Sequence, residues 1–491
     1  MATRARDIER DCQEPATPTA AEEYLNRLND GRNVVLNGEA VRHPARHPAL
    51  AGAVEGVVEY YNLQQSNPDI HCVETEGGSI PISLAVPRTA ADLAAKRRSF
   101  KAVAEASFGM LGRTPDFMNA AVMAISHHSE VLGRDALVDY SANARGFYIR
   151  CSRSNLFVAH AAINPQIDRD RVPGSIEHAY RAVGIVGSDD EGIVVRGAKM
   201  IATLAPIADE LLVFNMPGLA RGEEPHALAF AIPVNTPGVT LICRKAFHRP
   251  GYSRLDHPLA NRFDEIDSYV LFDNVRVPWD RVFVNQDVRA SNAFYDATFA
   301  RHHTGFQGVV RGLAKAEFVV GAALRLAEVL GVQSQSAVQA KLGELGSQVE
   351  ALRALIHFAE HEAAPSKAGV LAPSIAAIQA FRLLFPPAYR QTLELMRSLA
   401  PGSLLSGPNA ADLEGDTAAI LTEALTTDHA TARDRTFALN LAWDLVGDAF
   451  GQRQLTYEYY HAGSPEVIAR GQFHNYTWEN ERRLVAMIAN S

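Results

Sequence analysis

The segment GRTPDF, residues 112–117, places an arginine directly before a helix start. Thr114 suits the N-cap, Pro115 suits the first helical position because its missing N–H needs no partner, and Asp116 suits the positive end of the helix dipole. We therefore expect a helix to restart at Thr114. A guanidinium beside free backbone N–H groups attracts an anionic oxygen, and a phenolate fits such a site at Arg113.

Three regions must position this segment. Residues from about 18 to 164 carry apolar positions three and four apart, which predicts an all-helical first domain at 1–164. Short β-branched runs between turn residues follow, and they predict a middle domain of antiparallel strands, a small β-barrel, at 165–287. The helical period then returns and predicts a C-terminal helical bundle at 288–491.

Composition excludes several classes of protein. The 491 residues are 47% hydrophobic and 21% charged, and the net charge of -9 argues against a nucleic-acid surface, which needs concentrated basic residues. No apolar run reaches the roughly 18 to 20 residues of a membrane span. The first residues lack the apolar stretch of a secretory signal, so we expect a cytoplasmic protein.

Metal and nicotinamide sites are not expected. Cys12, Cys72, Cys151 and Cys243 lie far apart without a CxxC motif, which favours neither a zinc site nor a disulfide framework. The adjacent histidines in Arg301-His302-His303 point about 100° apart on a helix and cannot face one metal, although one of them could reach a ligand pocket. No GxGxxG motif follows a strand, so a Rossmann NADH site is absent.

Six segments, in order along nearly the whole chain, resemble the 4-hydroxyphenylacetate 3-monooxygenase family, the flavin-dependent oxygenase halves of two-component aromatic hydroxylases. They are EEYLNRLNDGRNVVLNGEAV, GRTPDFMN, HAAINPQIDR, GIVVRGAKMIATLAPIADE, FDNVRVPWDRVF and LAWDLVGDAFGQRQLTYE. The resemblance implies an acyl-CoA dehydrogenase-like fold, mainly α with the middle β-barrel domain. It also implies assembly as a homodimer or homotetramer.

The activity that the resemblance implies is ortho-hydroxylation of a phenolic substrate, of the 4-hydroxyphenylacetate or tyrosine-derived type, either free or carrier-bound. The oxygen atom comes from molecular oxygen through a C4a-hydroperoxyflavin. Since the sequence offers no nicotinamide site, FADH2 has to come from a separate NAD(P)H:flavin reductase. FAD is favoured over FMN by the segment at 451–453.

The same resemblance assigns the substrate residues. Arg113 and the aromatic residue four positions later contact the phenol oxygen, and that residue is typically tyrosine in the family. Here it is Phe117, which removes one hydroxyl donor. His160 is the expected catalytic partner of Arg113, because hydroxylation needs the phenolate form and histidine titrates near neutral pH.

Three further segments are assigned to the cofactor. Gln166 can offer a donor and an acceptor to the isoalloxazine edge, and Thr203 can hold a hydroperoxide through its hydroxyl. A glycine before an arginine near the C-terminus permits close approach and a fork on pyrophosphate, from a neighbouring subunit. The expected cofactor residues are Gln166, Ile167, Asp168, Arg169, Thr203, Gly451, Gln452 and Arg453.

Other functions remain open at this stage. The same flavin chemistry can expel halide or nitrite from a substituted phenol, and substrate trials separate these reactions. A relative of 4-hydroxybutyryl-CoA dehydratase would need an iron–sulfur cluster, for which Cys72 and Cys151 lack close pairing. A non-catalytic flavin-binding protein is the remaining alternative, and Phe117 is the motif departure that favours it.

Overall fold

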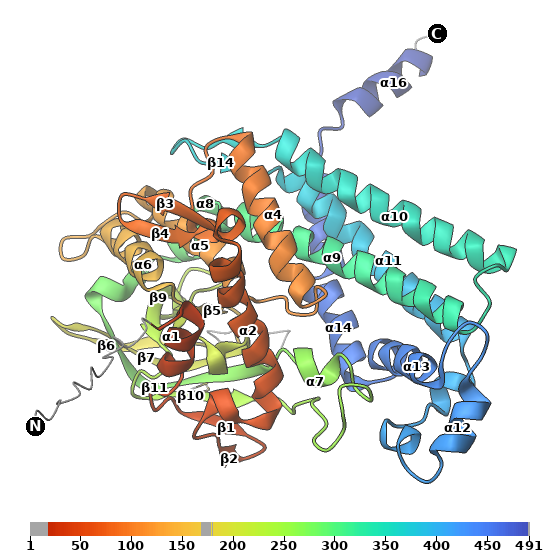
Figure 1. Ribbon diagram of the computed structural model, residues 1–491. Coiled ribbons are helices and arrows are strands. Elements are labelled where there is room, and N and C mark those ends of the chain that lie inside the picture. The colour runs from red at the N-terminus through yellow and green to blue at the C-terminus, as the bar shows by residue number, and fades with distance from the viewer. Residues whose placement is uncertain (1–17, 168–177, 179, 490–491) are drawn as a thin grey trace, which may run out of the picture.

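The computed structural model describes residues 18–167, 178 and 180–489. Helices come first along the chain, strands follow, and helices return, as the colours of Figure 1 show. This order agrees with the three regions expected from the sequence. The boundaries at 164/165 and 287/288 stay a prediction.

The first region is mainly helical. Its helices are α1 (Ala20–Arg27), α2 (Pro48–Ser66), α3 (Pro68–His71), α4 (Ala90–Ala106), α5 (Pro115–His127) and α6 (Tyr140–Ser154). Helix α4 shows how locally these elements are specified: Thr89 and Asp92 form a capping box that satisfies two N-terminal N–H groups. Leu93, Phe100 and Val103 then bury one face of the helix.

The expectation of an all-helical first region is wrong in one respect. It also contains strands β1 (Val34–Leu36), β2 (Glu39–Ala40), β3 (Cys72–Thr75) and β4 (Gly78–Pro81). Strand β1 pairs in parallel with β10 (Val239–Cys243), so the first region contributes to the central sheet. Runs of two to four residues are too short to show a strand period in sequence.

The middle strands form two open sheets rather than a closed barrel, within the part of the chain that the structure describes. The six-stranded sheet has the order β2-β1-β10-β11-β7-β6 and the four-stranded sheet the order β12-β9-β8-β5. The remaining strands are β5 (Val158–Ala161), β6 (Gly184–Ser188), β7 (Gly192–Thr203), β8 (Glu210–Val213), β9 (Leu228–Pro233), β11 (Asp267–Pro278) and β12 (Val282–Asn285).

The small sheet is buried on both faces, and the two sheets pack against each other. Strand β8 is buried at every residue and β9 at all but its last, so both faces of the small sheet are covered. The sheets pack against each other through side chains such as Phe230 and Phe272, whose ring centroids lie 6.0 Å apart. The strands are also not wholly antiparallel, since β5 runs parallel to β8.

The last region is a helical bundle. Its helices are α8 (Val288–Ala297), α9 (Ala300–Val329), α10 (Ser336–His361), α11 (Ile375–Leu399), α12 (Ala418–Leu425), α13 (Ala432–Val446), α14 (Ala449–Tyr460), α15 (Pro465–Asn475) and α16 (Glu479–Ala489). Helices α9, α10 and α11 run side by side, while α4 of the first region lies against α9. Three short elements remain: helix α7 (Ala260–Phe263) and strands β13 (Ala364–Pro365) and β14 (Leu371–Ala372).

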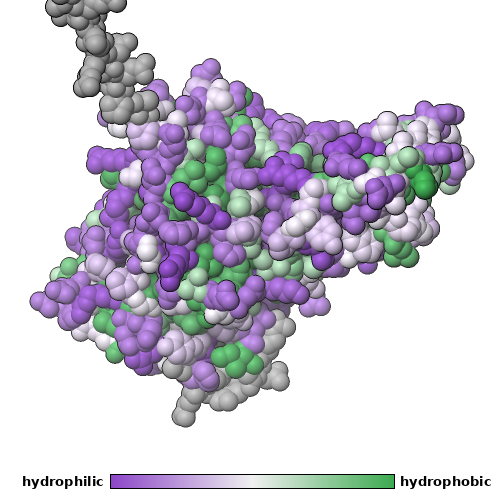
Figure 2. Space-filling model, turned by 60° about the horizontal axis from the view of Figure 1, so that its bottom comes forward, coloured by the Kyte–Doolittle hydropathy of each residue, from purple (hydrophilic) through white to green (hydrophobic). Residues whose placement is uncertain are grey.

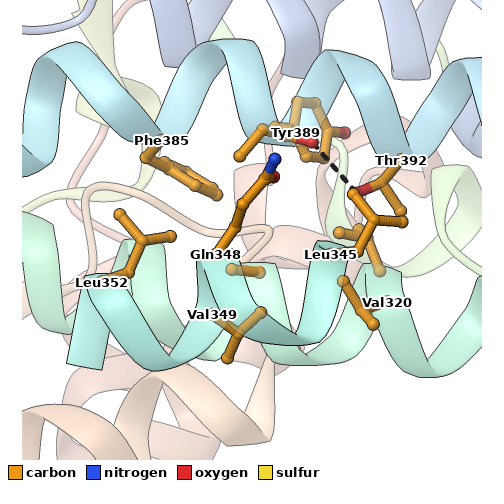
Figure 3. Close-up of a pocket in the computed structure, with 11 residues that line it drawn as sticks. Val320, Leu345, Gln348, Val349, Leu352, Phe385, Tyr389 and Thr392 are labelled. Carbon is orange, nitrogen blue, oxygen red and sulfur yellow. Dashed lines mark hydrogen bonds between the residues drawn. The ribbon is translucent and has the colours of Figure 1, made fainter. Parts of the chain in front are cut away.

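A gap between α9, α10 and α11 is too small for an organic ligand. Figure 3 shows side chains of the three helices around it, mostly apolar, with Gln348 and Tyr389 among them. About 10 Å³ remains open, which is room for a single water molecule. The functional site therefore has to be sought elsewhere.

The exterior is chemically mixed. On the face shown in Figure 2, apolar residues form small patches among polar ones. Among residues 18–167 and 180–489, no helix combines the length and the apolar character that a membrane span requires.

Candidate active site

The break before α5 is shaped by a carboxylate of the chain itself. Helix α5 begins at Pro115 with Thr114 at the N-cap position, as expected, although the Thr114 side chain makes no capping hydrogen bond. Glu265 Oε1 accepts hydrogen bonds from the backbone N–H groups of Gly112 and Arg113, at 2.7 and 2.6 Å. Glu265 therefore binds the two N–H groups that precede the helix start, while the expected role of the first-turn N–H groups of α5 stays a prediction.

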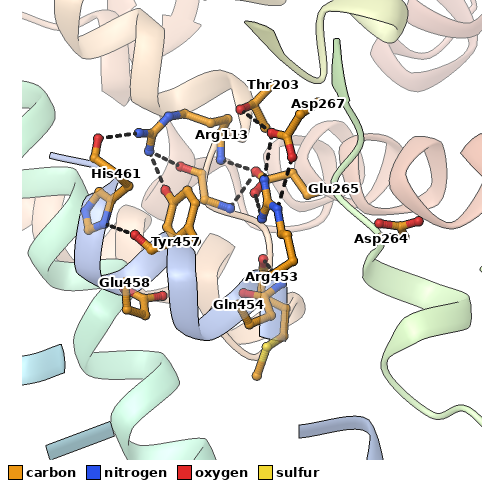
Figure 4. A network of polar contacts seen from close by, with 12 residues as sticks. Arg113, Thr203, Asp264, Glu265, Asp267, Arg453, Gln454, Tyr457, Glu458 and His461 are labelled. Atoms are coloured by element: carbon orange, nitrogen blue, oxygen red, sulfur yellow. Dashed lines mark hydrogen bonds and ion pairs between the residues drawn. The ribbon is translucent and has the colours of Figure 1, made fainter. Parts of the chain in front are cut away.

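The guanidinium of Arg113 has only neutral partners. Nη1 donates to the hydroxyl oxygen of Tyr457 at 2.5 Å and to the carbonyl oxygen of Gly112, and Nη2 donates to the carbonyl oxygen of His461. The residue is 7% exposed, and among the described residues its Nε has no hydrogen-bond partner and its guanidinium no carboxylate. Figure 4 shows the guanidinium extending over α14 toward Tyr457 and His461. A buried arginine without an ion pair is rare, because burying a lone charge is costly.

The ring of Phe117 lies close to both Arg113 and His160. The guanidinium carbon of Arg113 is 4.1 Å from the centroid of the Phe117 ring, and that ring lies 5.7 Å from the ring of His160. Helix α5 presents Phe117 one turn after the arginine, while β5 delivers His160 through its pairing with β8. The structure thus brings together the three residues expected to bind the substrate.

His160 is held in the neutral form. Burial, and secondly the positive charge of Arg113, lower the pKa of His160 to about 3. Its Nδ1 is buried without a hydrogen-bond partner. The expectation of titration near neutral pH is wrong for the protein without ligand, since desolvation and a nearby cation both disfavour the imidazolium.

A second group of charged residues holds the segment that precedes α5. Arg453 donates to Glu265 Oε2 at 2.8 Å and to both carboxylate oxygens of Asp267, and Thr203 donates its hydroxyl hydrogen to Asp267 Oδ1 at 2.8 Å. These contacts are drawn in Figure 4. Burial alone raises the pKa of Asp267, but the charge of Arg453 outweighs burial and lowers it to about 2. Glu265 thereby links Arg453 to the backbone of Arg113.

Family models match both halves of the chain, the 4-hydroxyphenylacetate 3-hydroxylase N-terminal region at residues 20–284 and the corresponding C-terminal region at residues 291–490. The chain belongs to this hydroxylase family. A relative from Thermus thermophilus, the oxygenase component of 4-hydroxyphenylacetate 3-monooxygenase, is 36% identical over 93% of this chain and 94% of that protein.

Solved structures agree with the hydroxylase assignment. The oxygenase component of 4-hydroxyphenylacetate 3-monooxygenase complexed with FAD is 35% identical, with a TM-score of 0.91 over 96% of this chain and 98% of that chain. The same component complexed with FAD and 4-hydroxyphenylacetate is 34% identical, with a TM-score of 0.91 and the same coverage of both chains. A glutaryl-coenzyme A dehydrogenase, 13% identical with a TM-score of 0.52, shares the fold alone, so the acyl-CoA dehydrogenase-like fold is confirmed.

In this hydroxylase, the segment expected to line the flavin is only partly described. Gln166 and Ile167 are exposed after the end of β5, while Asp168 and Arg169 lie outside the described residues. Ile163 pairs with Met200 of β7, which places this segment beside the end of that strand. The amide of Gln166 makes no hydrogen bond to a described residue, and it carries both a donor and an acceptor.

The end of β7 is irregular where it meets this segment. The register between β7 and β11 shifts between Ser268 and Val270, and Ile201 adopts a φ of 56°. Positive φ at a β-branched residue is strained, and such bulges re-aim the residues that follow. Ile201 and Ile167 are 48% and 51% exposed, which leaves apolar surface for a flat aromatic ring to cover.

The hydroxyl group of Thr203 already donates its hydrogen within the chain. Because its own hydrogen goes to Asp267, the hydroxyl oxygen can only accept from a ligand. A reduced flavin carries an N–H at N5 that can donate to such an oxygen. The Thr203 oxygen therefore fits a donor on the reduced flavin, and the expected hydrogen bond between Thr203 and a hydroperoxide stays a prediction in which Thr203 accepts.

The segment 451–453 has partners within its own chain. A Cβ at Gly451 would lie 2.2 Å from the carbonyl oxygen of Leu445, so this glycine lets α14 pack against the end of α13. Gln452 Nε2 donates to the carbonyl oxygen of Val446. Arg453 is engaged by Glu265 and Asp267, and the expected fork on pyrophosphate conflicts with this placement, since those carboxylates already occupy the guanidinium.

The metal and cluster alternatives find no support in the described residues. The one His/Cys/Asp/Glu group compact enough for a metal there is His257, Asp444 and Asp448. Its carboxylates already accept from His257, from backbone N–H groups and from Arg249. Of the four cysteines, Cys72, Cys151 and Cys243 are free and none belongs to such a group, and Cys12 lies outside the described residues.

The paired histidines at the start of α9 separate, as their spacing predicts. His302 Nδ1 lies 2.9 Å from the carbonyl oxygen of Pro373. His303 is buried, and burial lowers its pKa well below the usual value. In the part of the chain that the structure describes, neither histidine forms a hydrogen bond or ring contact with Arg113 or His160.

Sequence reasoning missed a buried ionic cluster under α14. Arg311 and Lys315 of α9 both donate to Glu458, and Lys315 also donates to Gln454. We call these four residues the anchor cluster. A signal existed in the sequence: Arg311 and Lys315 lie four residues apart on one helix face, in a mainly apolar run, and such a pair requires an anion once it is buried.

Proposed function

We propose that this chain is the oxygenase component of a two-component monooxygenase that hydroxylates a phenol, of the 4-hydroxyphenylacetate type, at the ortho position with reduced FAD and molecular oxygen. Membership of the hydroxylase family supports the reaction class. One observation of the site carries the proposal. The buried guanidinium of Arg113 lacks a carboxylate partner and lies against Phe117, next to His160.

The uncompensated charge of Arg113 favours the phenolate form of a bound phenol. Its Nε and the Nδ1 of His160 are both buried and unpartnered, so an oxygen placed between them would satisfy each. Electron density on the phenolate oxygen activates the ortho carbon toward an electrophilic oxygen. Arg113 therefore contributes both binding and activation.

His160 works here as a conditional base. Without ligand its pKa of about 3 keeps the imidazole neutral, and a phenolate beside it would raise that pKa because opposite charges stabilise each other. The phenol proton can then move to the imidazole only as the phenolate forms next to Arg113. The pair Arg113 and His160 thus couples proton transfer to substrate binding.

The cofactor would contact Gln166, Ile167, Ile201 and Thr203, which supply amide groups, exposed apolar surface and one hydroxyl acceptor. When bound, reduced FAD supplies, together with molecular oxygen, the electrophilic oxygen atom. FAD is favoured over FMN because related structures contain FAD. The relatives are named oxygenase components, and this chain lacks a dinucleotide motif, so a separate NAD(P)H:flavin reductase would deliver the reduced cofactor, in the cytoplasm.

Assembly into a homodimer or homotetramer is part of the proposal. Helix α16 projects from the body of the molecule in Figure 1 and has no buried residue. Its exposed residues include Leu484, Val485 and Met487. A second copy that covers this face would remove apolar surface from water. Mass photometry of a Val485→Glu, Met487→Glu variant should then show smaller particles than the parent protein.

The hydroxylation itself is tested with chemically reduced FAD, 4-hydroxyphenylacetate and ¹⁸O₂, followed by mass spectrometry of the product. We expect a catechol with one ¹⁸O atom from the parent protein, and little from Arg113→Gln or His160→Asn. The matched control is Arg276→Gln, which alters an exposed arginine on β11. Unlabelled product, or release of hydrogen peroxide with every phenol tested, would contradict the proposal; halide or nitrite release from substituted phenols would reveal the related elimination reactions.

A further inference from the structure

Two aromatic rings contact the guanidinium of Arg113. Phe117 lies 4.1 Å from the guanidinium carbon and Tyr457 lies 5.2 Å from it. Only Tyr457 carries a polar atom, and it comes from α14, 344 residues further along the chain. The Arg113 site therefore has an aromatic hydroxyl, supplied by the C-terminal helical region.

The hydroxyl hydrogen of Tyr457 remains available. Arginine has only N–H donors, so in the contact with Arg113 Nη1 the tyrosine oxygen must accept. Burial raises the pKa of Tyr457, although Arg113 and Arg311 act in the opposite direction, so the hydroxyl keeps its hydrogen at neutral pH. No described residue accepts that hydrogen.

Gly112 makes room for this hydroxyl. A Cβ at position 112 would lie 2.0 Å from Tyr457 Oη and 2.4 Å from its Cζ. Any other residue at this position would therefore displace the tyrosine ring or the backbone. Gly112 leaves space for the hydroxyl of Tyr457, and Arg113 holds that hydroxyl through a hydrogen bond.

Neighbouring groups fix the ring and make it a strong donor. The guanidinium carbons of Arg311 and Arg453 each lie 5.1 Å from the ring centroid of Tyr457, in addition to that of Arg113. His461 stacks on the ring with centroids 4.6 Å apart and an interplanar angle of 7°. Positive charge around a phenol ring draws electron density from its oxygen, and the O–H becomes a better hydrogen-bond donor.

We infer that Tyr457 donates its hydroxyl hydrogen to the phenolic oxygen of the substrate, beside Arg113. The inference rests on the proposed function and names a substrate-binding residue that neither the motif nor its spacing indicated. It also gives the site an O–H donor that Phe117 cannot provide. Tyr457 is partly exposed, as a residue that contacts a ligand must be.

The test measures how the protein shifts the ionisation of a bound phenol. 4-Nitrophenol is suitable because its phenolate is coloured, and the binding is followed anaerobically with reduced FAD present. The bound pKa and the Kd are determined for the parent protein, for Tyr457→Phe and for the control Tyr460→Phe, a tyrosine on the same helix that is 59% exposed. The parent protein should bind the phenolate and lower its pKa below that of the free phenol.

Tyr457→Phe should weaken phenolate binding by about tenfold or more and raise the bound pKa, because a hydrogen bond to a charged oxygen is lost. Tyr460→Phe should behave as the parent. The double variant Phe117→Tyr, Tyr457→Phe should regain part of the affinity, since it returns a hydroxyl to the Arg113 site; this rescue also distinguishes a lost donor from a disturbed fold.

The two possible failures are distinguishable. An unchanged Kd and bound pKa in Tyr457→Phe would overturn the inference and leave the proposed function in place. A weakened Tyr457→Phe that Phe117→Tyr does not rescue, with a bound pKa equal to that of the parent, would assign Tyr457 a structural role and also overturn it. Absence of phenolate binding by the parent protein would contradict the proposed function itself.

Discussion

Two groups of buried charges contact consecutive residues of α14, Tyr457 and Glu458, and differ in one respect. In the anchor cluster, both oxygens of Glu458 accept from Arg311, and Lys315 adds a further hydrogen bond at 2.7 Å. Around Arg113, by contrast, the acceptors are two carbonyl oxygens and the tyrosine hydroxyl. The anchor cluster contains a carboxylate that balances its cations, and the Arg113 site contains none among the described residues.

The difference separates a role in stability from a role in binding. A buried cation that is paired with a carboxylate holds helices together, and removal of the carboxylate leaves the cations without compensation. A buried cation with neutral partners lowers stability until an anion arrives. Such an arrangement is expected at a site that selects an anionic ligand.

The largest effect on stability should follow from removing the carboxylate of the anchor cluster. Glu458→Gln leaves Arg311 and Lys315 without a carboxylate, and we expect a loss of about 3–5 kcal/mol in the free energy of unfolding. Denaturant titration measures it, with Glu414→Gln as the control, an exposed residue whose change should stay within about 0.5 kcal/mol. Equal stability of the two variants would show that the anchor does not depend on its charge.

The converse experiment removes Arg113, the buried cation that has no carboxylate partner. Arg113→Met should leave the free energy of unfolding within about 1 kcal/mol of the parent, since no ion pair is broken. Hydroxylation measured as kcat/KM should fall by about a hundredfold, because the phenolate loses its main electrostatic partner. A loss of stability like that of Glu458→Gln would make the two groups equivalent and remove the distinction.

Gly112→Ala probes the packing that holds the tyrosine at the site. The new methyl group overlaps Tyr457 Oη, so the hydroxyl has to move away from Arg113. We expect kcat/KM to fall by about tenfold, a size typical of one lost hydrogen bond to a charged group. Gly146→Ala, where a Cβ meets nothing within 4 Å, is the matched control. Parent-like activity in Gly112→Ala would mean that the tyrosine position is not critical.

The smallest effect is a pH dependence of stability. The folded-state pKa of His160 lies near 3, below the ordinary value of 6.5, so the unfolded chain takes up its proton first as the pH falls. This contribution is present in full above pH 6.5 and is lost as the pH falls toward 3. Between pH 6.5 and 5.5 it amounts to about 1 kcal/mol. His160→Asn should lose that part of the slope in denaturant titrations, and an unchanged slope would contradict the lowered pKa.

The sequence predicted the parts of the site that depend on local order. Residues 112–117 specify a helix start, with Arg113 just before the N-cap and Phe117 in the first turn of α5, so the two side chains are close in sequence and in the fold. The convergence with His160 came from the family resemblance. The helix, strand and helix regions were also predicted from period alone.

The features that could not be predicted from the sequence are contacts between residues far apart along the chain. Glu265 fills the N–H groups before α5, and Arg453 turns toward Asp267, because the ends of β11 and α14 meet there. Such partner choices are set by topology and not by spacing. The same reason hid Tyr457, and it also hid the short strand β1, which pairs in parallel with β10 of the six-stranded sheet.

The most direct test of the central claim is a crystal structure of this protein with FAD and 4-hydroxyphenylacetate. We expect the phenolic oxygen within about 3 Å of Arg113 Nε and of His160 Nδ1, with the substrate ring beside Phe117. A phenolic oxygen bound elsewhere, with both nitrogens still lacking a contact to the ligand, would contradict it.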